Sequence, residues 1–213
     1  MTTRKRRPRL AVLASGGGTT LQALIDACMH ASEDASKDAR KTDSLHADVV
    51  LVISNNSTSG ALVRARQAGI PCRHISARTD PDNVDAAIAA ALQNARPNWV
   101  VLAGYMKRLG PQTLQACAGR VINTHPALLP AYGGEGFYGD RVHSAVLADR
   151  NLRSGATVHL VDEEYDRGPI LTQTTVPVCP DDSVEALRTR VQQAEKALLL
   201  YTLRHLLSSA SPE

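Results

Sequence analysis

Short apolar runs alternate with amphipathic segments along the first 125 residues of this 213-residue chain. The apolar runs do not alternate with polar positions, which predicts strands buried on both faces. Strands are expected at residues 10–15, 48–54, 71–76, 99–104 and 120–125, and helices at residues 20–29, about 60–69 and 84–95. This order is typical of the α/β class: an open, mostly parallel twisted sheet with helices on both faces.

The pattern changes after Leu129. Residues 155–161 and 170–178 predict two further strands, joined by a short connection and therefore expected to be antiparallel, and a long helix follows over about residues 183–207. Asp182 and Glu185 predict a capping box at the start of that helix. The polar stretch at residues 30–47 predicts a surface insertion, and residues 131–140, with four glycines, predict a mobile loop.

The composition indicates a core of small aliphatic side chains, because apolar residues make up 43% of the chain and aromatic residues only 3%. Much of the net charge of +3 lies in residues 4–9, which read as a solvated tail rather than a nucleic-acid patch. We expect a disordered basic tail over residues 1–9, a single domain over 10–207 and a disordered tail over 208–213. No segment resembles a signal peptide or a membrane span, so a cytoplasmic protein without membrane or nucleic-acid partners is expected.

The four cysteines lie far apart in the sequence, and no C-x-x-C pair occurs. Such spacing predicts neither a zinc site nor a redox motif. Small buried thiols are the expected role, and no metal is expected.

A glycine-rich segment, "SGGGTT" at residues 15–20, joins the first expected strand to the first expected helix. Glycines allow close approach of a ligand, and the free N–H groups of a helix start favour an anion. The dinucleotide motif is incomplete, because Gly16 and Gly18 match but Leu21 replaces its third glycine. A phosphate is thus more plausible here than a dinucleotide, and the alternative is a tight turn without a ligand.

Asn123 and His125 end the fifth expected strand in "VINTHPALLP". Because side chains alternate along a strand, both point to the same side, and Pro126 ends the strand at once. An amide N–H suits an oxyanion, and an imidazole moves protons, so the pair is suited to acyl transfer. No G-x-S-x-G motif accompanies the pair, which suggests that the substrate brings the nucleophile. A structural histidine is the alternative.

Four carboxylates cluster in "VDEEYDRGPI": Asp162, Glu163, Glu164 and Asp166. A carboxylate near His125 would raise the pKa of the imidazole and fix its tautomer. The residues alone do not select one of the four, and ordinary solvated loop acids are the alternative.

These segments, in this order, resemble the folate-dependent glycinamide ribonucleotide formyltransferases from about residue 10 to residue 207. The most specific part is N-x-H-P-[AS]-L-L-P with a downstream D-x-G-P, here "NTHPALLP" and "DRGP". The resemblance implies a Rossmann-like formyltransferase fold, with a phosphate-binding N-terminal half and a folate-binding, catalytic C-terminal half. It also implies transfer of the formyl group of 10-formyltetrahydrofolate, the co-substrate, to the amino group of glycinamide ribonucleotide in de novo purine biosynthesis. A monomer or homodimer without metal is expected.

The resemblance also implies roles for individual residues. Asn123 would stabilise the tetrahedral oxyanion, His125 would act as general acid and base, and Asp166 would tune His125. The phosphate and ribose of the ribonucleotide would be bound by Gly17, Gly18, Thr19, Thr20, Gln192 and Glu195. Folate would be bound by Met106, Lys107, Arg108, Leu109, Asn123, Asp162, Glu163, Glu164 and Tyr165.

Two departures from the family pattern bear on the site. The usual phosphate loop is S-G-x-G-S-N, and Thr19 and Thr20 here replace its Ser and Asn, so a hydroxyl is kept but the amide is missing. The segment after Pro130 is usually P-G-x-H but reads "YGGEGFYGDRVH" here, which leaves His143 without an assigned role.

Three other functions share parts of this pattern. Formyltetrahydrofolate deformylase uses a similar Asn-His-Asp set but has an extra N-terminal domain, and methionyl-tRNA formyltransferase needs a C-terminal tRNA-binding domain. A non-catalytic phosphate- or nucleotide-binding module would explain "SGGGTT" but not Asn123, His125 and Asp166 together.

Overall fold

The computed structural model describes residues 6–33 and 44–209, and the chain forms two compact units. The first unit is Met1–Arg120 with Leu203–Glu213, and the second is Val121–Thr202. The sequence predicted one domain with two functional halves, and the division between the units falls just before the expected catalytic strand. Within the described ranges, no helix has an apolar stretch sufficient to cross a lipid bilayer.

The first unit contains a parallel sheet in the strand order β3-β2-β1-β4. Its strands are β1 (Arg9–Leu13), β2 (Asp48–Ser54), β3 (Cys72–His74) and β4 (Trp99–Leu102). The central strand β1 is buried except at Arg9, as expected for an apolar run without alternation. The α/β class and the parallel sheet predicted from the sequence are confirmed.

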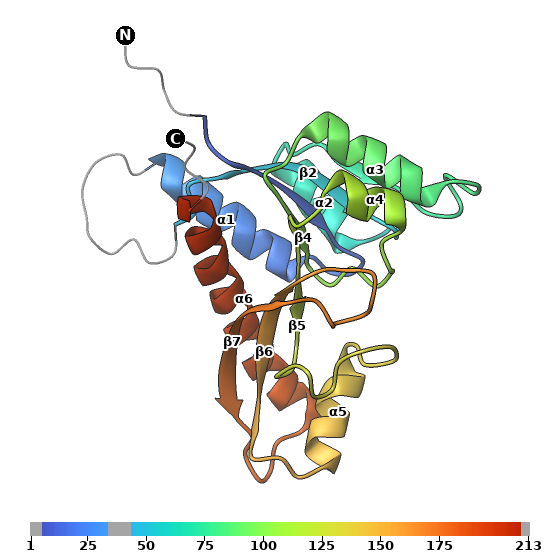
Figure 1. Ribbon diagram of the computed structural model, residues 1–213. Coiled ribbons are helices and arrows are strands. Elements are labelled where there is room, and N and C mark those ends of the chain that lie inside the picture. Colours follow the sequence, from blue (N-terminus) through green and yellow to red (C-terminus); the bar gives the residue numbers. More distant parts are fainter. Residues whose placement is uncertain (1–5, 34–43, 210–213) are drawn as a thin grey trace. The chain divides into compact units, whose positions relative to one another are not determined.

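Helices connect the strands of the first unit: α1 (Thr19–Glu33), α2 (Gly60–Gln67), α3 (Val84–Ala95) and α4 (Pro111–Ala116). The strand order runs outward from β1 to β3 and then returns to β4. Because such crossovers are right-handed, α1 and α2 cover one face and α3 covers the other. Figure 1 shows α1 on one side of these strands and α3 beside α4 on the other.

Two segments that were predicted to be loose make specific contacts within the first unit. Arg7, in the expected basic tail, donates hydrogen bonds to the carbonyls of Cys28 and Leu45, and β1 already begins at Arg9. Within the expected insertion, Leu45 is 1% exposed. The expected insertion begins within α1, which ends at Glu33. Residues 1–5 of the basic tail, 34–43 of the insertion and 210–213 of the C-terminal tail lie outside the described residues.

The second unit is built on antiparallel strands in the order β5-β6-β7. Its elements are β5 (Val121–His125), α5 (Asp140–Ala148), β6 (Arg153–Leu160), β7 (Ile170–Pro177) and most of α6 (Val184–Ser209), which continues past Thr202. The predicted antiparallel pair is therefore confirmed. The register places Asn123 opposite His159 and His125 opposite Thr157.

Two short helices were not predicted, α4 and α5. The N-terminus of α4 is satisfied by the side chain of Asp85 in α3, whose carboxylate accepts from the N–H groups of Gln112 and Thr113. Because the capping residue is distant in sequence, no local sequence pattern predicts the start of this helix. The helix α5 begins at Asp140, directly after the glycine-rich segment that suggested only a loop.

The predicted capping box of Asp182 and Glu185 is wrong. Ser183 caps α6 instead, because its hydroxyl accepts from the N–H of Ala186 at 3.1 Å. Asp182 binds Arg190 at 2.6 Å, and this hydrogen bond, with one from the N–H of Cys179, lowers the pKa of Asp182 to about 2. Asp182, one position before the cap, thus forms an ion pair with Arg190, two helical turns further along the chain.

Candidate functional site

The end of β5 presents Asn123 and His125 on one face and Thr124 on the other. His125 is 3% exposed and Asn123 is half-buried. On the opposite face, the hydroxyl of Thr124 donates to the carboxylate of Glu195 on α6 at 2.5 Å. Burial raises the pKa of Glu195, and the bond from Thr124 opposes that shift. Strand alternation therefore separates the amide–imidazole pair from the helix that packs behind it.

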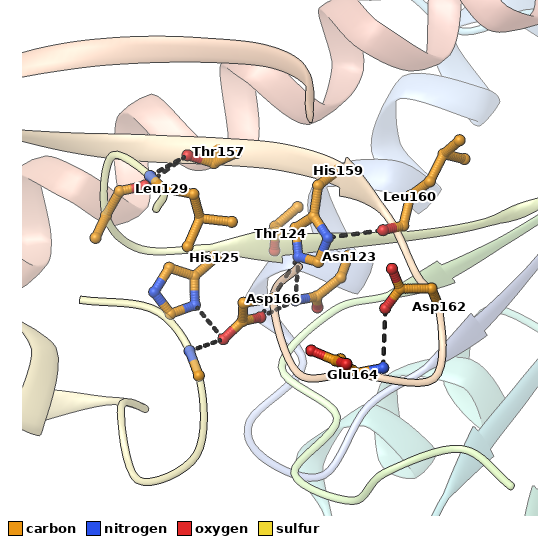
Figure 2. A network of polar contacts seen from close by, with 12 residues as sticks. Asn123, Thr124, His125, Leu129, Thr157, His159, Leu160, Asp162, Glu164 and Asp166 are labelled. Atoms are coloured by element: carbon orange, nitrogen blue, oxygen red, sulfur yellow. Dashed lines mark hydrogen bonds and ion pairs between the residues drawn. The ribbon is translucent and has the colours of Figure 1, made fainter. Parts of the chain in front are cut away.

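Asp166 joins that pair from the loop between β6 and β7. Figure 2 shows its carboxylate between His125 and His159. One oxygen, Oδ2, lies 3.4 Å from Nδ1 of His125 and accepts from the N–H of Gly134 at 3.0 Å. The other, Oδ1, lies 3.4 Å from the amide nitrogen of Asn123 and 3.5 Å from Nε2 of His159.

These contacts keep Asp166 ionised. Burial raises the pKa of the Asp166 carboxyl, but its neighbours His159 and His125 and the N–H of Gly134 outweigh it, so the net shift is downward. The backbone of Asp166 has φ of 56°, a left-handed conformation uncommon for a residue with a Cβ. Strained backbones of this kind are concentrated at functional sites.

Close packing around Asp166 depends on Gly133. A Cβ at Gly133 would lie 2.4 Å from Cδ2 of Leu129 and 3.3 Å from Cβ of Asp166. A side chain at this position would therefore force the Leu129 side chain to move and would crowd Asp166. Part of the predicted mobile loop thus contacts Asp166 directly.

Both ring nitrogens of His125 face an acceptor. Nε2 lies 2.6 Å from the carbonyl oxygen of Tyr132, and Nδ1 faces Asp166. Burial lowers the pKa of the His125 imidazole, while the Asp166 carboxylate and the Tyr132 carbonyl oppose that shift. Proton gain by this ring is thus disfavoured by desolvation and favoured by its two polar neighbours.

His159 belongs to the same network, and the sequence reasoning missed it. Its ring is 2% exposed, with Nδ1 2.8 Å from the carbonyl of Leu160 and Nε2 3.1 Å from the amide nitrogen of Asn123. The pairing of β5 with β6 would have revealed it, because that pairing places His159 opposite Asn123. The sequence contains no signal for that register.

The turn after His125 is fixed by side chains of β6 and β7. The hydroxyl of Thr157 donates to the carbonyl of Ala127 at 2.7 Å and accepts from the N–H of Leu129 at 3.1 Å. The amide of Gln173 donates to the same hydroxyl and to the carbonyl of Leu129, both at 2.9 Å. These bonds hold the chain immediately after the His125 imidazole, and the Leu129–Thr157 contact is drawn in Figure 2.

Asp162 and Glu164, two other acids of the cluster, make their bonds within their own loop and not to His125. Asp162, Glu163, Glu164 and Tyr165 are exposed. Asp162 accepts from the N–H of Glu164 at 2.9 Å, and Glu164 pairs with Arg167 at 3.2 Å. Of the four carboxylates that the sequence left open, Asp166 is the one placed against the imidazole.

In the first unit, the glycine-rich loop leads directly into α1, which begins at Thr19. Gly18 has φ of 73°, and a Cβ there would lie 2.7 Å from Cα of Ala61, so this position requires glycine. Arg64 of α2 donates to the carbonyl of Gly17 and to the side chain of Gln22, both at 3.0 Å. A guanidinium beside the loop was not anticipated from the sequence, and it adds positive charge near a helix N-terminus.

The remaining predicted binding residues fall into two groups. Met106, Lys107 and Arg108 are exposed after β4, whereas Leu109 is 5% exposed, and the N–H of Met106 donates to the hydroxyl of Ser15 at 2.8 Å. On α6, Gln192 is exposed and Glu195 is bound to Thr124. Within the described residues, no group of three or more His, Cys, Asp or Glu side chains is arranged to hold a metal ion.

The formyl transferase family matches residues 8–203 of the chain. Phosphoribosylglycinamide formyltransferase of Haemophilus influenzae is 40% identical over 88% of this chain and 81% of the relative. The chloroplastic protein of the same name from Vigna unguiculata is 38% identical over 91% of this chain. The match covers only 59% of that relative's length. The crystal structure of glycinamide ribonucleotide transformylase 1 from Symbiobacterium toebii has a TM-score of 0.85 at 33% identity, covering 98% of this chain and 92% of that one. The chain therefore belongs to the formyl transferase family.

Proposed function

We propose that this chain transfers the formyl group of 10-formyltetrahydrofolate to the amino group of glycinamide ribonucleotide, a step of de novo purine biosynthesis. The observation that carries the proposal is the convergence of Asn123, His125 and Asp166 at the end of β5. The names of the relatives from Haemophilus influenzae and Vigna unguiculata supply the substrate class.

Asn123 would act on the oxygen of the formyl group. When the substrate amine bonds to the formyl carbon, that oxygen gains negative charge, and an amide N–H can donate to it. One oxyanion donor is worth about 3–4 kcal/mol of transition-state stabilisation. His159 lies 3.1 Å from the amide nitrogen of Asn123 and orients it, whereas the contact with Asp166 is longer, at 3.4 Å. The N–H that points to Asp166 would therefore be the one that turns to the formyl oxygen.

His125 would carry the proton between the two nitrogens that exchange the formyl group. Bond formation leaves a surplus proton on the attacking amine, and cleavage of the bond to folate leaves a nitrogen that needs one. The two changes balance, so no external acid, base, metal or nucleotide is consumed. Positioned proton transfer contributes roughly 10²–10⁴-fold to such rates. The Asp166 carboxylate, 3.4 Å from Nδ1, would stabilise the imidazolium.

Binding of the two substrates follows the residues predicted for them. The phosphate would bind at Gly17, Gly18, Thr19 and Thr20, where the start of α1 offers N–H groups and Arg64 adds a positive charge. Gln192 and Glu195 would contact the ribose. Folate would be bound by residues 106–109 and by Asp162, Glu163, Glu164 and Tyr165, and the exposed Lys107 and Arg108 suit its acidic tail.

The test is a transfer assay with purified protein and 10-formyltetrahydrofolate, with and without glycinamide ribonucleotide, analysed by mass spectrometry. Formylated ribonucleotide, formed without added metal or ATP, is the expected product. Release of free formate without the ribonucleotide would instead support a deformylase. His125→Asn should abolish most of the activity, and Asp181→Asn, an exposed acid before α6, serves as the matched control.

A further inference from the structure

The glycine-rich loop carries an aromatic side chain whose bonds lie away from the catalytic pair. Tyr132 donates its hydroxyl to Asp149 at 2.6 Å and accepts from the amide of Asn151 at 2.5 Å. Its ring also packs edge-on against Phe137, with 6.1 Å between the ring centroids. Asp149 and Asn151 directly follow α5, so the side chain of Tyr132 ties the loop to the end of that helix.

The backbone of the same residue faces the catalytic histidine. The carbonyl of Tyr132 lies 2.6 Å from Nε2 of His125, although φ of Tyr132 is 55°, a conformation that residues with a Cβ seldom adopt. A backbone held in such a conformation needs compensating contacts. The two hydrogen bonds of the hydroxyl and the contact with Phe137 are such contacts.

The Tyr132 carbonyl constrains the protons of His125. A carbonyl only accepts hydrogen bonds, so a bond at 2.6 Å requires a proton on Nε2. Without this carbonyl, the Asp166 carboxylate would attract the single proton of a neutral ring to Nδ1 instead. The position of one backbone oxygen thus decides which ring nitrogen carries the proton.

We propose that Tyr132 is a positioning residue for His125: its hydroxyl, bound by Asp149 and Asn151, holds the Tyr132 carbonyl on Nε2 and keeps the proton on that nitrogen. The neutral ring of the free enzyme therefore carries its single proton on Nε2, and Asp166 stabilises the second proton when Nδ1 gains one. The catalytic part of this inference rests on the proposed formyl transfer, whereas the tautomer of His125 does not.

Other groups around His125 also act on its protonation. Asp166 raises the pKa of the ring from the loop after β6, His159 of β6 lowers it, and burial lowers it most. His143 of α5 also interacts electrostatically with His125. Because the Tyr132 carbonyl raises the pKa of His125, loosening the loop should move the titration of His125 to lower pH.

Tyr132→Phe tests the proposal, because it removes the hydroxyl and keeps the ring against Phe137. Asn151→Ala removes one partner of that hydroxyl and serves if the first variant fails to fold. The readout is ¹⁵N NMR of the His125 ring across pH, which distinguishes the two neutral tautomers. Tyr138→Phe, which removes another hydroxyl from the same loop, is the matched control.

Wild-type protein and Tyr138→Phe should show the Nε2–H tautomer. Tyr132→Phe and Asn151→Ala should show more Nδ1–H tautomer and a lower titration midpoint. In the transfer assay, kcat should fall by about 10- to 100-fold with little change in KM, as expected for a displaced catalytic group. An Nδ1–H tautomer in the wild type, or the wild-type tautomer and midpoint in both variants, would overturn the proposal. Absence of formyl transfer in every protein would count against the proposed function alone.

Discussion

Asn123 lies directly opposite His159 in the antiparallel pairing of β5 with β6, and its amide nitrogen is 3.1 Å from Nε2 of that ring. Nδ1 of His159 faces the carbonyl of Leu160 and must donate to it, so Nε2 of the neutral ring is an acceptor. The nitrogen end of the Asn123 amide is therefore directed by the histidine. A residue absent from the predicted site thus orients one of its members.

Replacing His159 should weaken catalysis through Asn123. His159→Leu removes the acceptor, frees the amide to rotate and should reduce kcat by about 10- to 100-fold. His159→Gln supplies a side-chain carbonyl as an acceptor and should retain more activity than the Leu variant. Steady-state kinetics of both variants, with circular dichroism to verify folding, makes the comparison. Equal losses in the two variants would show that the acceptor does not matter.

The charge of Asp166 should matter more than its shape. Asp166→Asn keeps an oxygen that can accept from Gly134 but removes the charge that stabilises the His125 imidazolium. A loss of about 10²-fold or more in kcat is expected, the lower range for positioned acid–base catalysis. The rate should be compared with that of Asp181→Asn, which neutralises an exposed acid of the same unit. Similar rates for the two variants would remove Asp166 from the mechanism.

The cap of α6 predicts a stability effect without a catalytic one. Ser183→Ala removes the acceptor for the N–H of Ala186 and should lower the free energy of unfolding by about 1 kcal/mol. Ser183→Thr keeps a hydroxyl and should restore most of that loss. Urea denaturation of the three proteins measures the difference, and kcat should stay unchanged. A destabilisation in Glu185→Ala but not in Ser183→Ala would revive the predicted capping box.

The sequence allowed prediction of the parts of this protein that depend on local patterns. The buried strands of the first unit are uniform apolar runs, and Asn123 and His125 share a face because strands alternate. The choice of Asp166 among four acids depended on family resemblance, and the structure places it against the imidazole.

What escaped prediction depends on tertiary contacts. His159 joins the site through a strand register, and Tyr132 through a loop that folds back onto His125. The helix α4 is capped by Asp85 from another helix. Glycine content alone indicated mobility for residues 131–140, whereas the loop makes specific bonds to both His125 and Asp166. None of these partners is a neighbour in sequence.

The buried His143 predicts how the free energy of unfolding changes with pH. It is 2% exposed in α5, and its Nδ1 has no hydrogen-bond partner. Burial lowers the pKa of His143 below its ordinary value of 6.5, with Asp140 opposing and Arg188 and His125 adding to the shift. A histidine whose folded-state pKa is depressed binds its proton more readily in the unfolded chain. The stability it contributes is present above the unfolded pKa and is lost as pH falls through the folded one.

The burial of His125 lowers its pKa as well, so both rings act in the same direction. The free energy of unfolding should therefore decrease as the pH is lowered from 7.5 through the ordinary histidine pKa of 6.5 toward 5. His143→Leu cannot take up a proton, so its unfolding free energy should vary less with pH over this window. Urea unfolding at several pH values measures both slopes. A slope in His143→Leu as steep as that of the wild type would show that His143 does not titrate with unfolding.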